Sequence, residues 1–461
     1  MYLLPLLAVT ACSGLSPQQK EAQRHWEEMK EVEASIELTE FPDAQFDITQ
    51  FGAVAGSDAS EAIRAAIQAC NEQGGGHVII PADTFYTKAI HLLSNVDLHL
   101  EEGAVLKFST CPSDYLPQVP SSWEGQDLMG LSPLIYANGQ TNIAVTGKGL
   151  LDGQASRENW WQRRTFNAFL QGGDVPLMGK AKLRYYEQNN TPLEERIFTE
   201  EDGLRPQFIQ FYRCNRILIA DVTLNNAPFW QLHPLMSKNI VVRGVTMDSH
   251  GPNNDGCDPE SCENVLIEDC VFDTGDDCIA IKSGRNNDGR NRNMPSRNLI
   301  VRNSIMKDGH AAVAIGSEIS GSCYNVWFEN CVVGSPNMNR PFRIKSNAIR
   351  GGVVKGFYIR NIEISECNES VVRMELAYER VKEGPNYPTF EDVFIQNVTC
   401  QKAPYGILID GLDEPVCIHN IYMENCRFDG IENEEVNHIT SAADPIMMKD
   451  CWFNGVKYPQ E

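Results

Sequence analysis

A nine-residue pattern that recurs along the second half of the chain constrains the fold more than any other feature. Each copy reads roughly Asn, apolar, any, apolar, polar, Asn or Asp, small, any, apolar, and the nine copies start 23 to 36 residues apart. The alternation predicts a strand with one buried face, and the small or Asn/Asp centre predicts a bend. The copies are RILIADVTL from Arg216, NIVVRGVTM from Asn239, NVLIEDCVF from Asn264, NLIVRNSIM from Asn298, NVWFENCVV from Asn325, GFYIRNIEI from Gly356, DVFIQNVTC from Asp392, NIYMENCRF from Asn420 and PIMMKDCWF from Pro445.

Repeats of this length indicate a solenoid, because one copy is too small to bury its own apolar face and must stack on its neighbours. A Greek-key sandwich would show turns every 8 to 12 residues without a common register. We therefore predict an all-β fold, a single-stranded right-handed parallel β-helix. One domain over residues 46–461 follows, since solenoids grow by adding coils.

A helix is expected before the first coils. Asp58 and Glu61 have the spacing of a capping box, and apolar residues then recur on one helical face, at Ala62, Ile63, Ala66, Ile67 and Cys70. Three glycines end this segment, and no Lys-Ser/Thr follows to make a phosphate-binding loop. Such a helix would cap the exposed end of the solenoid.

Residues 155–207 interrupt the repeat with little strand alternation. We interpret them as an insertion of loops and short helix. Long excursions of this kind are usually functional, and the alternative is a flap that packs against the flank of the solenoid.

The N-terminus resembles an export signal. Residues 1–11 are a short apolar run, and Val9-Thr10-Ala11-Cys12 resembles a bacterial lipobox, which would make Cys12 the acylated first residue and residues 12–45 a tether. Ser13 would fit outer-membrane sorting in a Gram-negative bacterium, facing either periplasm or cell surface. No Lys or Arg precedes the apolar run, so an ordinary signal peptide with a chance cysteine is the alternative.

The net charge of −23 and a pI near 4.8 argue against nucleic acid or an anionic membrane surface as partner. Membrane contact is expected only through the lipid anchor, and the chain is expected to be a monomer. An acidic substrate would require local positive charge in the site.

Fourteen cysteines remain after Cys12, an even number that is compatible with disulfides. However, Cys270, Cys331, Cys426 and Cys451 occupy one position of the repeat, which favours buried thiols stacked in the core. No zinc-site spacing occurs, so we predict no structural metal.

Three aspartates lie in glycine-bounded turns on both sides of one repeat strand: Asp255, Asp276 and Asp277. In a coil that returns once per repeat, both turns would meet in one cleft. Cleavage of a glycosidic bond with inversion needs a protonated carboxyl and an ionised one, and crowded carboxyls push their pKa values apart. The alternative is that Asp and Gly simply mark tight turns.

Basic groups follow on successive coils. Lys282 and Arg285 come first, then His310, then Arg343 and Lys345. Because parallel strands stack about 4.8 Å apart, matching positions form one continuous floor. Positive groups beside the aspartates favour an anionic sugar whose carboxylate pairs with Arg or Lys.

The motifs NNDGCDP, TGDDCIAIKSG, GHAAVAIGSE and RIK, in this order, resemble the four motifs of the polygalacturonases, glycoside hydrolase family 28. The resemblance implies a pectin-lyase-like solenoid, no cofactor and a pectic substrate. It implies that Asp276 is the general acid, that Asp255 and Asp277 hold and deprotonate water, and that His310 tunes the acid. Arg343 and Lys345 would bind the galacturonate carboxylate, and Asn253 would contact the sugar or shape its loop.

Two departures from the family pattern bear on specificity. Ala311 stands where the family often has glycine, and IKSGR followed by DGR resembles the exo-acting branch. With the insertion, this favours a cleft closed at one end that releases single sugars. Endo action, a catalytically inactive pectin-binding β-helix and a calcium-dependent lyase are the alternatives, and the pectic backbone stays open between homogalacturonan, rhamnogalacturonan and a substituted galacturonan.

Overall fold

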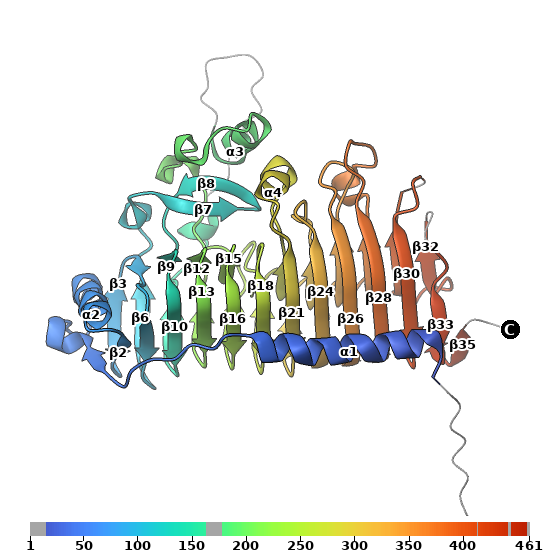
Figure 1. The fold of residues 1–461 in the computed structure, drawn as a ribbon, viewed down its shortest axis with the longest axis horizontal. Helices are drawn as coiled ribbons and strands as arrows, with labels where there is room; N and C mark the ends of the chain where they lie inside the picture. Colours follow the sequence, from blue (N-terminus) through green and yellow to red (C-terminus); the bar gives the residue numbers. More distant parts are fainter. Residues whose placement is uncertain (1–14, 163–177, 413, 441–443, 459–461) are drawn as a thin grey trace, which may run out of the picture.

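The computed structural model describes residues 15–162, 178–412, 414–440 and 444–458, which form a long solenoid of stacked β-coils (Figure 1). The predicted parallel β-helix is confirmed, because every strand pairing is parallel except β7 with β8 and β34 with β35. The strands form one sheet of 23, one of six, one of four and one hairpin. In the largest sheet, each coil contributes one strand or a bent pair of strands, and successive coils stack along the length of the molecule.

The largest sheet contains both halves of each repeat copy. Its strands are β1 (Gln45–Asp47), β2 (Gly76–Ile80), β3 (Thr84–Thr87), β5 (Val96–Leu100), β6 (Val105–Phe108), β10 (Thr141–Gly147), β11 (Leu150–Asp152), β13 (Asn215–Ala220), β14 (Thr223–Asn225), β16 (Lys238–Arg243), β17 (Thr246–Ser249), β18 (Glu263–Glu268), β19 (Val271–Thr274), β21 (Ser296–Arg302), β22 (Ile305–Asp308), β24 (Cys323–Val333), β26 (Val353–Ile364), β28 (Thr389–Cys400), β30 (Ile418–Glu424), β31 (Arg427–Phe428), β33 (Met447–Lys449), β34 (Cys451–Phe453) and β35 (Val456–Tyr458).

Two smaller sheets carry the strands that lead to the functional residues. The six-stranded sheet contains β20 (Ile279–Ile281), β23 (Val313–Ile315), β25 (Phe342–Lys345), β27 (Ser370–Glu375), β29 (Tyr405–Asp410) and β32 (Asn437–Ile439), and the four-stranded sheet contains β4 (Ile90–His91), β9 (Ile135–Asn138), β12 (Ile209–Tyr212) and β15 (Leu232–Leu235).

The bend predicted at the centre of each copy has a backbone cause. The residue there has positive φ in every copy, a conformation that Asn, Asp and Gly adopt at the least cost: Asp221, Gly244, Asp269, Asn303, Asn330, Asn361, Asn397, Asn425 and Asp450. The asparagine amides also stack, since Asn361 donates to Asn330 at 2.9 Å and Asn397 donates to Asn361 at 3.0 Å. These bonds tie each bend to the next coil.

The predicted thiol stack is present. Cys270, Cys331, Cys426 and Cys451 are buried, and each of the fourteen cysteines that the structure describes is a free thiol. Burial raises the pKa of Cys270 and of Cys331 to about 12, so both remain neutral core residues.

The predicted capping helix is α2 (Ser60–Glu72), and it buries all five expected apolar residues. The expected capping box is wrong, because the N-cap is Ala59 rather than Asp58. The Asp58 carboxylate instead accepts the Ser60 N–H at 2.9 Å, and Glu61 pairs with Arg64.

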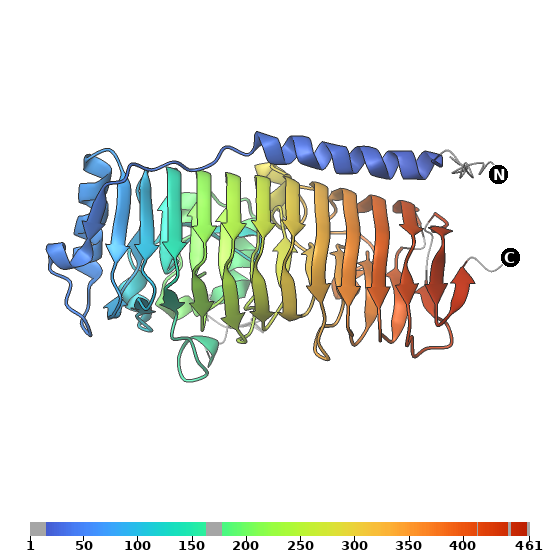
Figure 2. The same cartoon turned by 90° about the horizontal axis from the view of Figure 1, so that it is seen from below.

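The segment expected to be a tether contains α1 (Pro17–Ser35), a helix that lies along the outer face of the largest sheet (Figure 2). Trp26 donates to the Gln396 side chain at 3.0 Å and stacks under the Arg360 guanidinium. The helix and the sheet bury an apolar stripe formed by Ala22, Trp26, Met29, Ile36, Val241, Leu266, Ile300, Trp327, Tyr358, Phe394 and Tyr422. Residues 17–35 are therefore fixed to the solenoid.

Three segments stand out from the coils on one side (Figure 1). The first is the hairpin of β7 (Val119–Trp123) and β8 (Gln126–Gly130), and the second is the insertion, whose described part contains η3 (Trp160–Gln162), α3 (Gly179–Gln188), η4 (Leu193–Glu195) and η5 (Glu200–Asp202). The third is α4 (Asn286–Arg292). The short helices η1 (Ile48–Phe51), η2 (Pro112–Tyr115) and η6 (Tyr378–Arg380) lie in other turns.

Two expectations lie partly or wholly outside the described residues. Cys12 and the apolar run before it are outside them, as is the stretch 163–177 of the insertion. Within the described residues, no helix has both the length and the apolar character that a membrane crossing requires.

Candidate active site

The coil geometry brings the aspartates of two turns together. Asp255 lies between β17 and the bridge residue Cys257, which pairs with both β15 and β20. Asp276 and Asp277 lie between β19 and β20, one coil further along. The Gly256 N–H donates to the Asp277 carbonyl at 3.1 Å, so the two turns are joined through their backbones. One oxygen from each of the three carboxyls lies within 4.8 Å of the others.

These carboxyls line a cleft of about 260 Å³ between the solenoid and the segments that stand out from it. Seven of the predicted site residues line it: Asn253, Asp255, Asp276, Asp277, Lys282, Arg285 and Lys345. His310 and Arg343 do not line it but lie beside it. Its remaining wall is Glu124, Lys180, Arg184, Trp230, Ser317, Glu318, Tyr378 and Glu379.

Asp277 is held as a carboxylate. Its side chain is 2% exposed, and Lys345 Nζ donates to its Oδ2 at 3.0 Å. Burial alone would raise the pKa of Asp277, but Lys345, Arg343 and Lys282 outweigh it and lower that pKa. Asp277 is therefore held in the ionised form that a general base requires.

Asp255 has the opposite tendency. Burial and the charges of Asp258 and Asp276 raise the pKa of Asp255 well above its usual value, although Lys282 opposes them. Asp258 is itself fully buried, and neither of its carboxyl oxygens has a hydrogen-bond partner among the described residues. The pKa directions of Asp255 and Asp277 are therefore split, as expected for carboxyls that share one site.

Asp276 is the carboxyl that a ligand can reach, since its side chain is 23% exposed. His310 Nδ1 lies 3.0 Å from Asp276 Oδ1, and the His310 N–H donates to the Asp276 carbonyl at 2.9 Å. The hydrogen bond to Asp276 raises the pKa of His310 against the effect of burial. His310 thus orients the Asp276 carboxyl.

Asn253 is held by a residue that sequence reasoning missed. Its Oδ1 accepts from Arg205 at 2.7 Å, and Arg205 also donates to the Pro228 and Pro252 carbonyls at 2.8 and 2.5 Å. Arg205 is buried in the last residues of the insertion, so the insertion fixes the Asn253 turn. Asn253 has φ of 55°, which an asparagine tolerates.

Each of the basic residues Lys282, Arg343 and Arg285 has at least one acidic neighbour within the protein. Lys282 Nζ lies 3.5 Å from Glu318 and 4.5 Å from the centroid of the Trp230 ring, so its charge is compensated inside the protein. Arg343 donates to Glu375 at 3.1 Å. Arg285 lies between two carboxylates, 3.6 Å from Glu124 and 3.8 Å from Glu379.

Sequence reasoning missed the cleft residues that come from segments outside the repeat. Glu124 comes from the hairpin turn, Lys180 and Arg184 from α3, and Tyr378 and Glu379 from η6. The Tyr378 ring lies 5.6 Å from Lys345 Nζ and 5.5 Å from the Arg343 guanidinium, so it completes the wall around both basic residues. The position of Trp230 could have been predicted from the sequence. Trp230 comes two residues before Leu232 of β15, and Asp255 comes two residues before Cys257, which pairs with Leu232.

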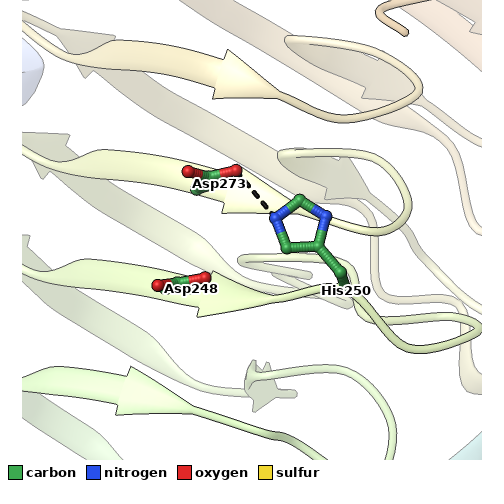
Figure 3. Close-up of side chains that lie close together, drawn as sticks. All are labelled: Asp248, His250 and Asp273. Carbon is green, nitrogen blue, oxygen red and sulfur yellow. Dashed lines mark hydrogen bonds and ion pairs between the residues drawn. The ribbon is translucent and has the colours of Figure 1, made fainter.

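Figure 3 shows a second group of possible metal ligands, Asp248, His250 and Asp273, none of which lines the cleft. His250 Nε2 is 2.8 Å from Asp273 Oδ1, and Lys307 Nζ is 3.3 Å from the other oxygen of Asp273. Asp248 and Asp273 are register partners on β17 and β19. The half-buried Asp273 thus pairs with His250 and Lys307 from the coils on either side of it.

The chain resembles known proteins in both sequence and fold. Residues 194–443 match the family model described as glycosyl hydrolases family 28. The crystal structure of a hyperthermoactive exopolygalacturonase from Thermotoga maritima is similar over 93% of this chain and 96% of that chain, with a TM-score of 0.84 and 35% identity.

Two curated relatives match over part of their length. A probable polygalacturonase of Vitis vinifera is 32% identical over 63% of this chain and 53% of that protein. An exo-poly-alpha-D-galacturonosidase of Dickeya chrysanthemi is 27% identical over 77% of this chain and 62% of that protein. The chain thus spans between half and two thirds of the length of these relatives.

Proposed function

Because the chain belongs to glycoside hydrolase family 28, we propose that it hydrolyses α-linked galacturonate in pectic polysaccharides or oligosaccharides, acting from a chain end. The observation that carries this proposal is the cleft itself. It gathers Asp255, Asp276 and Asp277 within 4.8 Å, next to Lys345, in a protein of net charge −23. The five basic side chains that line the cleft beside its six acidic ones offer partners for the carboxylate of an anionic sugar.

In the proposed reaction, Asp276 protonates the leaving oxygen, because it is the exposed carboxyl of the three. Asp277 takes the proton from the attacking water, since its neighbours keep it ionised. Asp255 orients that water by a hydrogen bond rather than as a second base, because its pKa is raised. His310 positions Asp276 and supports its change of charge.

Inversion at the anomeric carbon is part of the proposal. Carboxyl pairs stand roughly 6.5–9.5 Å apart in inverting enzymes and roughly 5–5.5 Å apart in retaining ones, whereas this cluster is tighter than both. Separation alone therefore favours retention. We place the water between Asp255 and Asp277, with Asp276 on the side of the leaving group, so that no gap between widely spaced carboxyls is needed.

Arg343 and Lys345 bind the galacturonate carboxylate in this proposal, and Tyr378 packs against both. Each of the two basic residues already has an acidic neighbour, Glu375 for Arg343 and Asp277 for Lys345. A substrate carboxylate would therefore share these cations with the protein. Lys282 and Arg285 are similarly shared, and they hold the cleft together as well as contacting the sugar.

Chain-end action is supported by the segments around the cleft. The hairpin contributes Glu124 and the insertion contributes Lys180 and Arg184, and Lys180 Nζ lies 2.7 Å from Glu124. A groove obstructed in this way receives a chain terminus more readily than a chain interior. The Thermotoga and Dickeya relatives are named as exo-acting enzymes, which favours the same reading.

We also propose that residues 1–11 are a signal peptide and that Cys12 carries a lipid anchor on the outer membrane of a Gram-negative bacterium. Residue 17, where α1 begins, follows Cys12 closely in the sequence. Labelling with a radioactive fatty acid tests this, with Cys12→Ala as the control that should lose both the label and membrane association.

The proposed activity is tested by product analysis on defined homogalacturonan, rhamnogalacturonan and substituted galacturonan oligosaccharides. The wild type should release monomer from the first time points on at least one backbone, and Asp276→Asn should release it at least about 100-fold more slowly at the same enzyme concentration. A ladder of oligomers at once would show endo action, and no hydrolysis with tight binding would show a pectin-binding β-helix. Chain cleavage that leaves an unsaturated uronate end instead of adding water, and that vanishes with calcium chelation, would show a lyase.

A further inference from the structure

The cleft is bounded at one end by three segments that are far apart in the sequence. They are the hairpin 119–130, residues 178–207 of the insertion, and residues 285–292, which are Arg285 and α4. We call them together the end wall. Figure 1 shows them side by side above the coils, and α3 contacts both β8 and α4.

One buried ion pair joins all three segments. Arg196 of the insertion donates two hydrogen bonds to the Asp288 carboxylate of α4, at 2.7 and 3.0 Å. The Asp127 N–H of the hairpin donates to the same carboxylate at 3.0 Å, and Arg196 donates to the Asp127 carbonyl at 3.1 Å. The Arg196 and Asp288 side chains are 6% and 3% exposed, so this pair is shielded from water.

A second buried pair ties the same segments to the solenoid. Arg292 of α4 donates to the Asp127 carboxylate and to Glu260, both at 2.6 Å. Glu260 is fully buried in the floor and accepts from His233 at 2.9 Å and from Ser122 of the hairpin at 3.2 Å. Both pairs thus meet at the hairpin, and the second fixes it to the coil that bears Glu260.

The hairpin turn is placed against the cleft with little free space. The Arg285 N–H donates to the Gly125 carbonyl at 2.8 Å. A Cβ on Gly125 would lie 2.8 Å from the Glu318 side chain and 2.9 Å from the Arg285 nitrogen, and its φ is 76°. A small shift of the hairpin would therefore move Glu124 and Arg285, both of which line the cleft.

We propose that Arg196, Asp288 and Arg292 are positioning residues that hold the end wall as one unit and thereby fix how far a substrate chain can extend past the cleaved bond. This rests on the proposed function. The bidentate Arg–carboxylate geometry sets one relative position of the three segments, which apolar packing would specify less sharply. None of the three residues lines the cleft, so they act through Glu124, Arg285 and the α3 side chains.

The test uses the double variant Arg196→Met with Asp288→Leu, because removing both charges together leaves neither partner as an unpaired buried ion. The matched control is Arg360→Met with Glu329→Leu. In that pair two guanidinium nitrogens of Arg360 contact one Glu329 oxygen, at 2.7 and 2.5 Å, and the pair lies on the face covered by α1. A third variant, Arg196→Lys, keeps the positive charge but cannot donate two parallel hydrogen bonds to the Asp288 carboxylate.

On polymeric galacturonan, the wall variant should lower the initial ratio of monomer to longer products by about tenfold, since displacements of ~1 Å have effects of this order or larger. The control variant should keep the wild-type ratio, and Arg196→Lys should fall between them. The rate on the shortest cleavable oligosaccharide should change much less in every variant. A folded wall variant with the wild-type product ratio would overturn the proposal.

Hydrogen exchange separates this proposal from the proposed function, because it needs no activity. In the wall variant, amides of both the hairpin and α4 should exchange faster by about tenfold or more, and those of the catalytic coils should not. Faster exchange at residues 178–207 alone would show that the pair does not join the three segments. A wild type without galacturonan hydrolysis would refute the function, while the exchange result would still decide whether the wall is one unit.

Discussion

Replacing Lys345 by Met should shift the acid limb of the pH–rate profile upward. Lys345 Nζ lies 3.0 Å from Asp277 Oδ2, and both side chains are largely buried. A neighbouring opposite charge lowers the pKa of a carboxyl by about 1–3 units. Burial remains in the variant and raises that pKa, so the limb should move up by about the same 1–3 units.

The magnitude follows directly. Below the limb the rate falls in proportion to the ionised fraction of Asp277, so an acidic assay should show an additional loss of about 10- to 1,000-fold relative to neutral pH. Weaker substrate binding by the variant adds a loss that is the same at every pH above the limb. The two effects therefore separate in a plot of kcat/KM against pH.

Arg343→Met is the matched control. Arg343 is paired with Glu375 rather than hydrogen-bonded to Asp277, so its loss should move the limb less. The substrate carboxylates titrate in the same way with both variants, so they do not contribute to a difference between the two acid limbs. A depressed carboxyl pKa also stabilises the fold above the unfolded-state pKa and loses that effect as pH falls through the folded-state value. Lys345→Met should accordingly lower Tm more at pH 7 than at pH 3. An acid limb that coincides with that of the wild type would refute the assignment of Asp277 as the base.

Three further outcomes are expected. Asp276→Asn should reduce kcat by at least about 100-fold with Tm nearly unchanged, because the proton donor is lost from a nearly isosteric side chain, and a variant with a third of the activity would rule out the acid role. Methyl esterification of the terminal galacturonate should sharply reduce kcat/KM in the wild type, whereas equal rates on ester and free acid would make Arg343 and Lys345 structural residues. Trp26→Ala should destabilise the docking of α1 by about 3–5 kcal/mol, seen as faster proteolysis within residues 17–40 at unchanged activity, and a helix as resistant as in the wild type would contradict the packing described for it.

The repeat could be predicted because its cause is local. Asn and Asp at the bends adopt positive φ, and alternating apolar residues define a buried face, so each copy specifies its own coil. Stacking then brings the turns of Asp255 and Asp276 together without any other information. The same reasoning placed Lys345, since β25 is in register with β23.

The sequence also contains local patterns typical of the hairpin and of α1, although neither element was predicted from them. Glu124-Gly125 separates two short strand-like runs, and both residues have positive φ, as a two-residue hairpin turn requires. Ser16, Pro17 and Gln19 form the start of α1 with a capping box. The many charged residues of α1 conceal its narrow apolar stripe.

Other features depend on contacts that no local pattern encodes. Tyr378 and Glu379 come from a loop with no repeat register, so only the fold places them beside Lys345. The opposite pKa directions of Asp255 and Asp277 arise because Asp258 lies near the first and Lys345 near the second. The ion pair of Arg196 with Asp288 joins an insertion to a helix 92 positions later.

The stereochemistry of the first product tests the central claim most directly, because the claim is that Asp277 activates a water while Asp276 protonates the leaving oxygen. Proton NMR during the first minutes on an α-linked galacturonate oligosaccharide should show the β-anomer of the newly released sugar before mutarotation. An initial α-anomer would show a covalent intermediate and contradict the roles given to Asp255 and Asp277.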